Sequence, residues 1–223
     1  MTIQWENWSG LQRSEPKHLV MPKNTEVLRQ VIQQHHKIRV VGAGHSFSPL
    51  VKTSDTLLSL DHFQGLIDHD EEECSAEIWA GTRIYQLPTI LNPLNQALQN
   101  QGDIDQQSLA GAVSTGTHGT GNQLPCLSAL VTAFELVTAQ GEVLTCNAQQ
   151  NSDIFHAGRV SLGSLGIITK LTLKNRPRYK LKEHVQLVRL QDILTQMNDW
   201  KTQHRHIESF VFPFHDQAIL KTL

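Results

Sequence analysis

The stretch Gly-Asp-Ile-Asp-Gln-Gln-Ser-Leu-Ala-Gly-Ala-Val-Ser-Thr-Gly-Thr-His-Gly-Thr-Gly, residues 102–121, is the most distinctive part of the chain. Its glycines are too frequent for a regular helix, because glycine loses more conformational freedom on ordering than any other residue. Its small polar residues can place many backbone N–H groups around an anion. The stretch therefore predicts a ligand-binding loop, and the alternative is a solvated loop without a ligand.

A second glycine-rich segment lies upstream, at Val40-Val41-Gly42-Ala43-Gly44-His45-Ser46. It follows a short β-branched run, and a strand that ends in Gly-x-Gly can bring successive N–H groups close to a pyrophosphate. It is not a Walker loop, because no Gly-Lys-Ser/Thr follows, and Pro49 and Leu50 stand where the helix of a Rossmann fingerprint would open. A plain tight turn is the alternative. Two such segments in one chain are hard to explain by packing, so together they favour a nucleotide site.

Two histidines accompany these segments. His45 directly follows Gly44 and would lie near any bound nucleotide. A neutral imidazole nitrogen is a competent nucleophile toward an electrophilic cofactor carbon. His118 lies between Gly116 and Gly119, which suggests that its backbone or ring is close to the ligand. For each of them the alternative is an ordinary surface or hydrogen-bonding histidine.

Composition narrows the class of protein. With 223 residues, 39% of them hydrophobic and 18% charged, the chain can form one large domain, or one domain and part of another. A net charge of −2 gives no sign of a nucleic-acid partner. The three cysteines are widely spaced, which argues against a disulfide framework and a metal site. Without a signal-peptide pattern or a membrane-length apolar run, the chain is expected to be cytoplasmic, with a peripheral membrane position left open.

The order of helix-like and strand-like segments predicts an α+β fold. Arg176-Pro177-Arg178 is expected to mark a domain junction. Hydrophobic periodicity predicts helices over 24–36, 84–99 (limited or kinked by Pro88 and Pro93), 154–162 and 190–203, and strands over 38–41, 56–60, 76–80, 130–138, 143–146, 167–173 and 207–212.

The motifs resemble those of the vanillyl-alcohol-oxidase-type (PCMH-type) FAD-binding superfamily. Residues 42–46 look like its pyrophosphate motif, and residues 102–105 and 114–121 look like its second FAD motif. Gly-Ser-Leu-Gly-Ile-Ile-Thr, residues 163–169, is similar to a strand that contacts FAD late in the domain. Asn7-Trp8-Ser9-Gly10 resembles the N-terminal opening of its aldonolactone oxidase branch, which comprises L-gulonolactone oxidase, D-arabinono-lactone oxidase and the alditol oxidases. The resemblance extends to about Lys174.

The resemblance implies a two-subdomain FAD-binding domain over 1–176, followed over 177–223 by the start of a truncated α+β substrate domain. It implies FAD joined covalently to His45 through the flavin 8α-methyl carbon. Gly102 would act as an oxygen gate, since family dehydrogenases tend to carry a larger residue there; an ordinary turn glycine is the alternative. The implied cofactor-binding residues are Val40, Val41, Gly42, Ala43, Gly44, His45, Ser46, Asp103, Ser108, Gly111, Ser114, Thr115, Gly116, Thr117, His118, Ile167 and Ile168.

The implied reaction is hydride transfer from a sugar-1,4-lactone or related polyol to the flavin, with O2 as the acceptor that yields H2O2, or another acceptor in its place. No residue is convincing as the catalytic base. The family's His-Trp-x-Lys-type motif does not occur in the chain, which stops at Leu223. Two alternatives therefore stay open: an alditol oxidase, and an FAD-binding module or fragment without turnover of its own.

Overall fold

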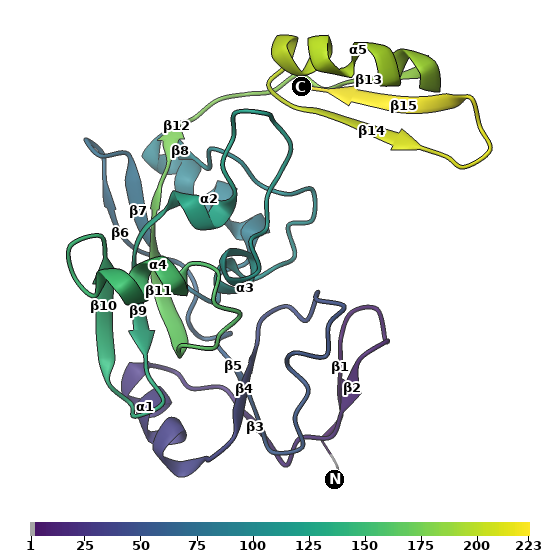
Figure 1. The fold of residues 1–223 in the computed structure, drawn as a ribbon. Coiled ribbons are helices and arrows are strands. Elements are labelled where there is room, and N and C mark those ends of the chain that lie inside the picture. Colours follow the sequence, from purple (N-terminus) through teal and green to yellow (C-terminus); the bar gives the residue numbers. More distant parts are fainter. Residues whose placement is uncertain (1–2) are drawn as a thin grey trace.

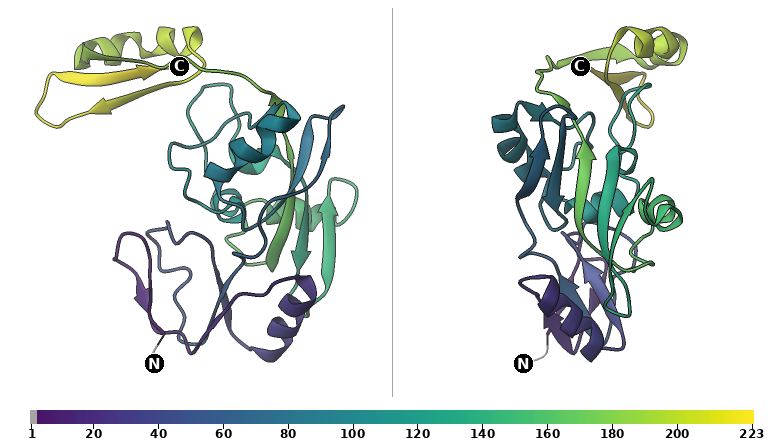
Figure 2. Two further views of the ribbon diagram at one scale, coloured as in Figure 1. Left: turned by 180° about the vertical axis from the view of Figure 1, so that it is seen from behind. Right: turned by 90° about the vertical axis from the view of Figure 1, so that its left-hand side faces the viewer.

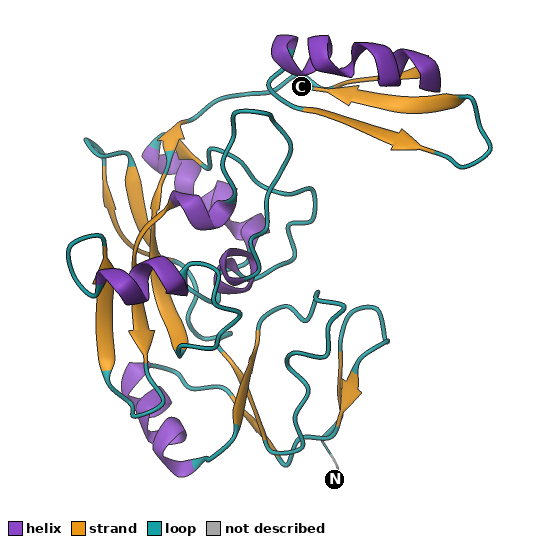
Figure 3. Cartoon of the chain, in the orientation of Figure 1, coloured by secondary structure: helices purple, strands orange, loops and turns teal. Residues whose placement is uncertain are grey.

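The computed structural model describes residues 3–223, and three units follow one another along its long axis (Figures 1 and 2). An N-terminal unit holds the hairpin β1–β2 and a small parallel sheet. A central unit is built on a five-stranded sheet, and a C-terminal unit packs one helix on a separate sheet (Figure 3). The N-terminal and C-terminal units lie at opposite ends of the central one (Figure 2).

The N-terminal unit carries the first glycine-rich segment at the end of a strand. Its sheet has the order β3-β5-β4 with parallel pairing, and helix α1 connects β3 to β4. The side chain of Asn24 caps α1 by accepting a hydrogen bond from the Val27 N–H at 2.9 Å, and Leu28 is fully buried on the inner face of the helix. The bounds are β1 Trp5–Glu6, β2 Arg13–Ser14, β3 His18–Val20, α1 Thr25–Gln34, β4 Ile38–Val41 and β5 Thr56–Ser59.

The central sheet is antiparallel with the order β10-β9-β11-β7-β6, and its core contains the fully buried Ile78 and Leu171. The strands predicted over 130–138 and 143–146 are confirmed as β9 and β10, which pair as an antiparallel hairpin. Strand β6 has no counterpart among the predictions. The bounds are β6 Leu66–Asp70, β7 Ser75–Trp79, β9 Val131–Val137, β10 Val143–Asn147, α4 Ser152–Gly158 and β11 Ile167–Lys174.

The helical segment predicted over 84–99, which Pro88 and Pro93 were expected to limit or kink, is divided into three short helices and the short strand β8. Pro88 lies in the first turn of α2 and Pro93 in the first turn of η2, where a proline is tolerated but cannot continue a preceding helix. Asn95 then takes a left-handed conformation with a φ of 54° and ends the helical path. The elements are η1 Ile84–Gln86, α2 Leu87–Leu91, η2 Asn92–Leu94 and β8 Gln96–Ala97.

The expectation that residues 102–121 contain no regular helix is wrong, since α3 spans Leu109–Ser114. Three of its six residues, Leu109, Ala112 and Val113, are buried against the central core. Packing of these side chains against the core therefore stabilises α3 and offsets the destabilising effect of its glycine. The rest of the stretch is loop and turn, in agreement with the prediction.

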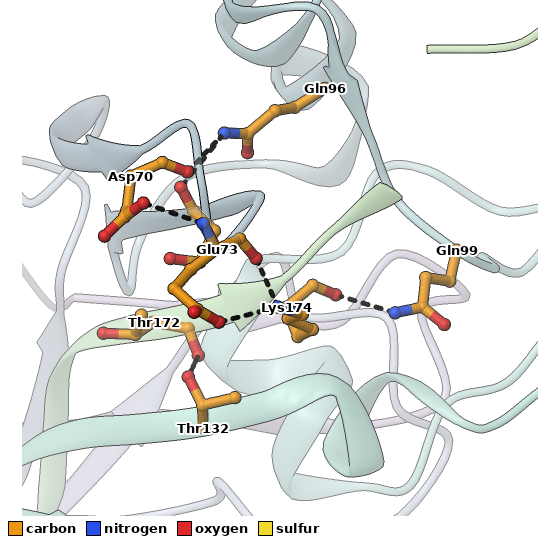
Figure 4. Close-up of polar contacts among 8 residues, drawn as sticks. Asp70, Glu73, Gln96, Gln99, Thr132, Thr172 and Lys174 are labelled. Atoms are coloured by element: carbon orange, nitrogen blue, oxygen red, sulfur yellow. Dashed lines mark hydrogen bonds and ion pairs between the residues drawn. The ribbon is translucent and has the colours of Figure 1, made fainter. Parts of the chain in front are cut away.

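Polar contacts fix the strand ends that lead into the second glycine-rich stretch (Figure 4). Lys174, at the end of β11, contacts the carboxylate of Glu73 at 3.0 Å and also donates to its backbone carbonyl. Gln96 donates to the Asp70 carbonyl at 3.2 Å, and Gln99 donates to the Lys174 carbonyl at 3.2 Å. The segment 96–99 is thereby held on the central sheet just before the chain reaches Gly102.

The C-terminal unit consists of α5 and a sheet of order β13-β15-β14. The predicted helix over 190–203 is confirmed by α5, and Arg176–Pro177 forms the short strand β12, which pairs with β8 ahead of this unit. Across residues 3–223, no helix combines the length and apolar character needed to cross a bilayer. The bounds are β12 Arg176–Pro177, β13 His184–Arg189, α5 Leu190–Gln203, β14 Ile207–Val211 and β15 Gln217–Thr222.

Candidate functional site

A cavity of about 260 Å³ lies where the N-terminal unit meets the central one. The first glycine-rich segment, the start and inner face of α3, and the turn before β11 all line it. Twelve of the predicted FAD-binding residues, together with His45, are thus brought to one place. The predicted residues in its wall are Val40, Val41, Gly42, Ala43, Gly44, His45, Ser46, Ser108, Gly111, Ser114, Thr115, Ile167 and Ile168, and this space is called the first cavity below.

At Gly42 the two glycine-rich segments approach each other closely. A Cβ added at Gly42 would lie 2.1 Å from Ser108 Oγ and 3.2 Å from Ser108 Cβ. The residue is not among those with positive φ, so this close approach, rather than the backbone conformation, is what requires glycine. The loop and the start of α3 therefore form one continuous wall of the first cavity.

The hairpin β1–β2 holds the loop that carries His45. Trp8 donates from its backbone N–H to the Gly44 carbonyl at 3.1 Å and from its indole N–H to the His45 carbonyl at 2.9 Å. The buried Asn7 donates to the Ser46 carbonyl at 3.0 Å. These bonds satisfy three successive carbonyls, so the loop is fixed from outside the cavity.

The imidazole of His45 is oriented by its neighbours. The Trp8 indole stacks on it with ring centroids 5.3 Å apart and planes 14° apart. His45 Nδ1 lies 3.4 Å from the Ala43 carbonyl oxygen, and the residue is only partly buried. One ring face is thereby covered while the side chain still reaches the cavity lining.

The second glycine-rich stretch divides between two places. Residues 108–115 belong to the first cavity, but Gly102, Asp103 and His118 line a separate cavity of about 580 Å³, called the second cavity below. Gly116 and Thr117 contribute to the lining of neither, although Thr117 accepts a hydrogen bond at 3.1 Å from Gln107, a first-cavity residue. The stretch thus connects the two cavities.

The C-terminal unit closes one side of the second cavity with charged and titratable groups. Lys221 lies 3.0 Å from a Glu208 oxygen, 3.3 Å from Glu183 and 3.7 Å from Asp103. Its pKa is raised, chiefly by the hydrogen bond to Glu208. The ion pair with Asp103 ties this unit to the second glycine-rich stretch.

A buried histidine, His206, lines the same cavity and contacts Thr120 Oγ1 at 3.1 Å through Nδ1. Burial lowers its pKa, and the neighbouring Arg205 lowers it further. The ring is therefore favoured in its neutral form. Arg205 itself donates to the Gln99 carbonyl at 2.8 Å, which adds a second link between the C-terminal unit and the 96–103 segment.

Several lining residues of the first cavity were not predicted, above all Asp61, Arg83 and Gln107. Asp61 follows β5 and Arg83 follows β7, so the two are distant in sequence, yet they form an ion pair at 2.7 Å. The only sequence feature that could have indicated Asp61 and Arg83 is a charged residue directly after a predicted strand. This feature is too common to identify a binding residue. Gln107 lies within residues 102–121, directly before Ser108, but was not singled out because its side chain is neither small nor a hydroxyl.

A third cavity of about 320 Å³ lies beside the first, along the end of α1 and the turn after β9. The two share the bend from Val40 to Val51 and the turn at 162–167, through Val40, Leu50, Val51, Leu162, Gly163, Gly166 and Ile167.

Residues 16–147 match the family model described as FAD binding domain. The chain belongs to this FAD-binding family. It is 35% identical over its whole length to the L-gulono-1,4-lactone dehydrogenase of Mycobacterium tuberculosis, of which it covers 52%. It is 32% identical, over 96% of its length, to the D-arabinono-1,4-lactone oxidase of Candida albicans, of which it covers 42%. The FAD-binding chain therefore spans about half the length of these relatives, and its expected resemblance to the aldonolactone oxidase branch is confirmed.

The fold of this FAD-binding chain is shared with solved structures. A cholesterol oxidase from Brevibacterium sterolicum, solved as a His121Ala mutant, superposes with a TM-score of 0.83 at 18% identity over the whole chain and 47% of the oxidase. The predicted α+β architecture and the FAD-binding fold are confirmed, and the chain spans about half the length of the oxidase. The placement of the domain boundary at 176/177 stays a prediction.

The residues of the first cavity fit FAD by their own chemistry. The backbone of residues 42–46 is open to close approach because Gly42 and Gly44 carry no side chains, and Ser108, Ser114 and Thr115 add hydroxyl groups. Arg83 contributes a buried guanidinium nitrogen, Nη1, that has no hydrogen-bond partner within the protein. An anionic, oxygen-rich ligand would satisfy both the loop and this nitrogen.

Proposed function

We propose that this chain supplies the FAD-binding part of an oxidoreductase that oxidises a CH–OH group of a sugar-1,4-lactone or a related polyol. The observation that carries the proposal is the convergence of both glycine-rich segments and His45 on the first cavity. The names of the relatives, a lactone dehydrogenase and a lactone oxidase, support the substrate class. Bound FAD would accept the hydride from the substrate carbon and pass its electrons to O2, with H2O2 as the product.

In this proposal, the chain's residues bind and orient the cofactor. Val40 to Ser46 surround the diphosphate with backbone N–H groups, while Ser108, Gly111, Ser114 and Thr115 form the facing wall. Ile167 and Ile168 lie on the floor of the first cavity at the start of β11. Asp103, Gly116, Thr117 and His118 would contact the flavin end from the loop that connects the two cavities.

His45 would be the point of covalent attachment. Its ring is stacked on Trp8 and lies in the cavity wall. The side chain is therefore already oriented, and a ring nitrogen could reach the flavin without a change of rotamer. Attachment would replace the imidazole N–H and one 8α C–H of bound FAD by a C–N bond, with O2 taking up the two hydrogens as H2O2. The protein's task is to hold the neutral imidazole in place.

A substrate screen distinguishes the proposed lactone oxidoreductase from two alternative functions. An alditol oxidase would use the same cavity on open-chain polyols, and an FAD-binding module would hold the cofactor without turnover. The full-length gene product should be screened with a panel of 1,4-lactones and polyols in a peroxide-coupled assay, with anaerobic bleaching of the flavin as a second readout. Bleaching by lactones supports the proposal and bleaching by polyols alone supports the alditol oxidase. Flavin that no member of the panel bleaches would refute both enzymes in favour of the module.

Gly102 is proposed as the residue that admits O2 to the flavin. This proposal can be tested without knowing the substrate. An added Cβ would lie 3.2 Å from the His118 carbonyl oxygen and 3.5 Å from Thr117 Cγ2, so alanine would fill the space beside the loop. We expect Gly102→Ala to slow the reoxidation of photoreduced flavin by air severalfold while the flavin content is unchanged. An unaltered reoxidation rate would exclude Gly102 as the gate.

A further inference from the structure

The first cavity has a single cationic side chain among its described lining residues, that of Arg83. Its guanidinium lies deep, with 16% of the side chain exposed, whereas the paired Asp61 side chain is 41% exposed. The loop 40–46 offers backbone N–H groups to an anion and contains no Lys or Arg. An anion in a partly buried cavity is bound more tightly when a fixed positive charge lies beside it.

Two contacts hold Arg83 in place. Nη2 donates to Asp61 Oδ1 at 2.7 Å, and the backbone N–H donates to the side chain of Gln86 at 2.7 Å. Asp61 reaches Arg83 because Gly81 lets the two chain segments touch: a Cβ at Gly81 would lie 2.1 Å from the Leu60 carbonyl oxygen. Asp61, at the end of the N-terminal unit, therefore fixes the orientation of the Arg83 guanidinium at the boundary between the N-terminal and central units, where the first cavity lies.

The second guanidinium nitrogen, Nη1, is buried and has no partner in the described protein. A buried polar nitrogen without a partner is unfavourable, and a charged one more so, which makes such an atom a marker for a missing ligand. Arg83 also pairs with Ser108 through an isolated antiparallel bridge, and Ser108 is the residue against which Gly42 packs. Arg83, Ser108 and Gly42 consequently form one continuous surface.

We propose that Arg83 is the cationic anchor for the FAD diphosphate, with Nη1 donating to a phosphate oxygen and Asp61 fixing the orientation of the guanidinium. The planar fork of arginine suits this division, because one arm can bind a carboxylate while the other binds a phosphate oxygen. The proposal rests on FAD occupying the first cavity, and it requires neither the attachment at His45 nor any particular substrate.

The test uses the His45→Ala background, in which FAD can exchange whether or not the native cofactor is covalent. Dissociation constants of the apoprotein for FAD and for ADP, which has the diphosphate but no flavin ring, are measured by calorimetry. Arg83→Met should weaken both by about tenfold or more, the value of one charge-assisted hydrogen bond, and Arg83→Lys should lie between. Arg189→Met is the matched control, since Arg189 pairs with Asp192 outside both cavities.

Unchanged binding of both ligands by a folded Arg83→Met protein would overturn the proposal. Weakened FAD binding with unchanged ADP binding would also overturn it, because that result places Arg83 at the flavin ring. If Arg83→Met does not fold, as judged by melting of the apoprotein, Asp61→Asn and Arg83→Lys decide the question. Both retain the positive charge but lose its orientation, so weaker ADP binding supports the proposal and wild-type ADP binding contradicts it.

Discussion

Replacing His45 with alanine should move the flavin from the acid-precipitated protein into the supernatant. Wild-type protein is expected to give a yellow pellet, and His45→Ala a colourless one, because no other residue is proposed to bond the flavin. The loss of covalent flavin should be complete. The measurement is the visible absorbance of pellet and supernatant after acid precipitation, supported by fluorescence of the protein band in a denaturing gel.

FAD should nevertheless remain bound to His45→Ala before acid is added. The contacts that shape the loop use the carbonyls of Gly44, His45 and Ser46 as acceptors, and the substitution leaves them all in place. His118→Ala is the matched control, because His118 lies in the wall of the second cavity and should keep a yellow pellet when replaced. Wild-type flavin that is already free after acid would disprove the attachment while leaving reversible binding intact.

Replacing Gly42 with alanine should weaken both the fold and the binding of FAD. The new Cβ would have to occupy a position 2.1 Å from Ser108 Oγ, so either the loop or the start of α3 must move. Overpacking of this kind costs about 1–3 kcal/mol of unfolding free energy. For a chain of this size, that corresponds to a fall of several degrees in Tm. Thermal unfolding and the flavin content of the purified protein are the two measurements.

The pair Gly42 and Ser108 allows a direct test of cause. Ser108→Ala removes the oxygen at 2.1 Å and leaves only the Cβ at 3.2 Å, which small shifts can accommodate. The double variant Gly42→Ala/Ser108→Ala should therefore recover much of the stability that Gly42→Ala loses, with Ser108→Ala alone as the reference. A double variant no better than Gly42→Ala would show that the defect has another origin.

Local patterns predicted those parts of the fold that local forces determine. The apolar periodicity of α1 and α5 and the β-branched runs of β4 and β11 were sufficient to predict these elements. The glycine-rich segments also identified most of the first cavity. These patterns predicted less of 84–99, where prolines divide the helical segment, and failed at α3, where tertiary packing stabilises a glycine-containing helix.

Contacts between distant segments account for the remainder. Trp8 and His45 are 37 residues apart, and Asp61 and Arg83 are 22 apart, so nothing in the local sequence of either pair indicates the partner. The division of residues 102–121 between two cavities has the same cause. It depends on the C-terminal unit, whose Lys221 and His206 contact Asp103 and Thr120. Motif recognition named these residues together, and only the three-dimensional arrangement separates them.

The stacking of Trp8 on His45 has a spectroscopic consequence. Indole emission overlaps flavin absorption, so a flavin attached to His45 would quench Trp8 by energy transfer at nearly contact distance. Trp5 also lines the first cavity, so the flavin would quench Trp5 and Trp8, two of the four tryptophans in the chain. Loss of indole fluorescence would therefore follow cofactor loading continuously in the intact protein, and Trp8→Phe would identify the part of the signal that comes from Trp8.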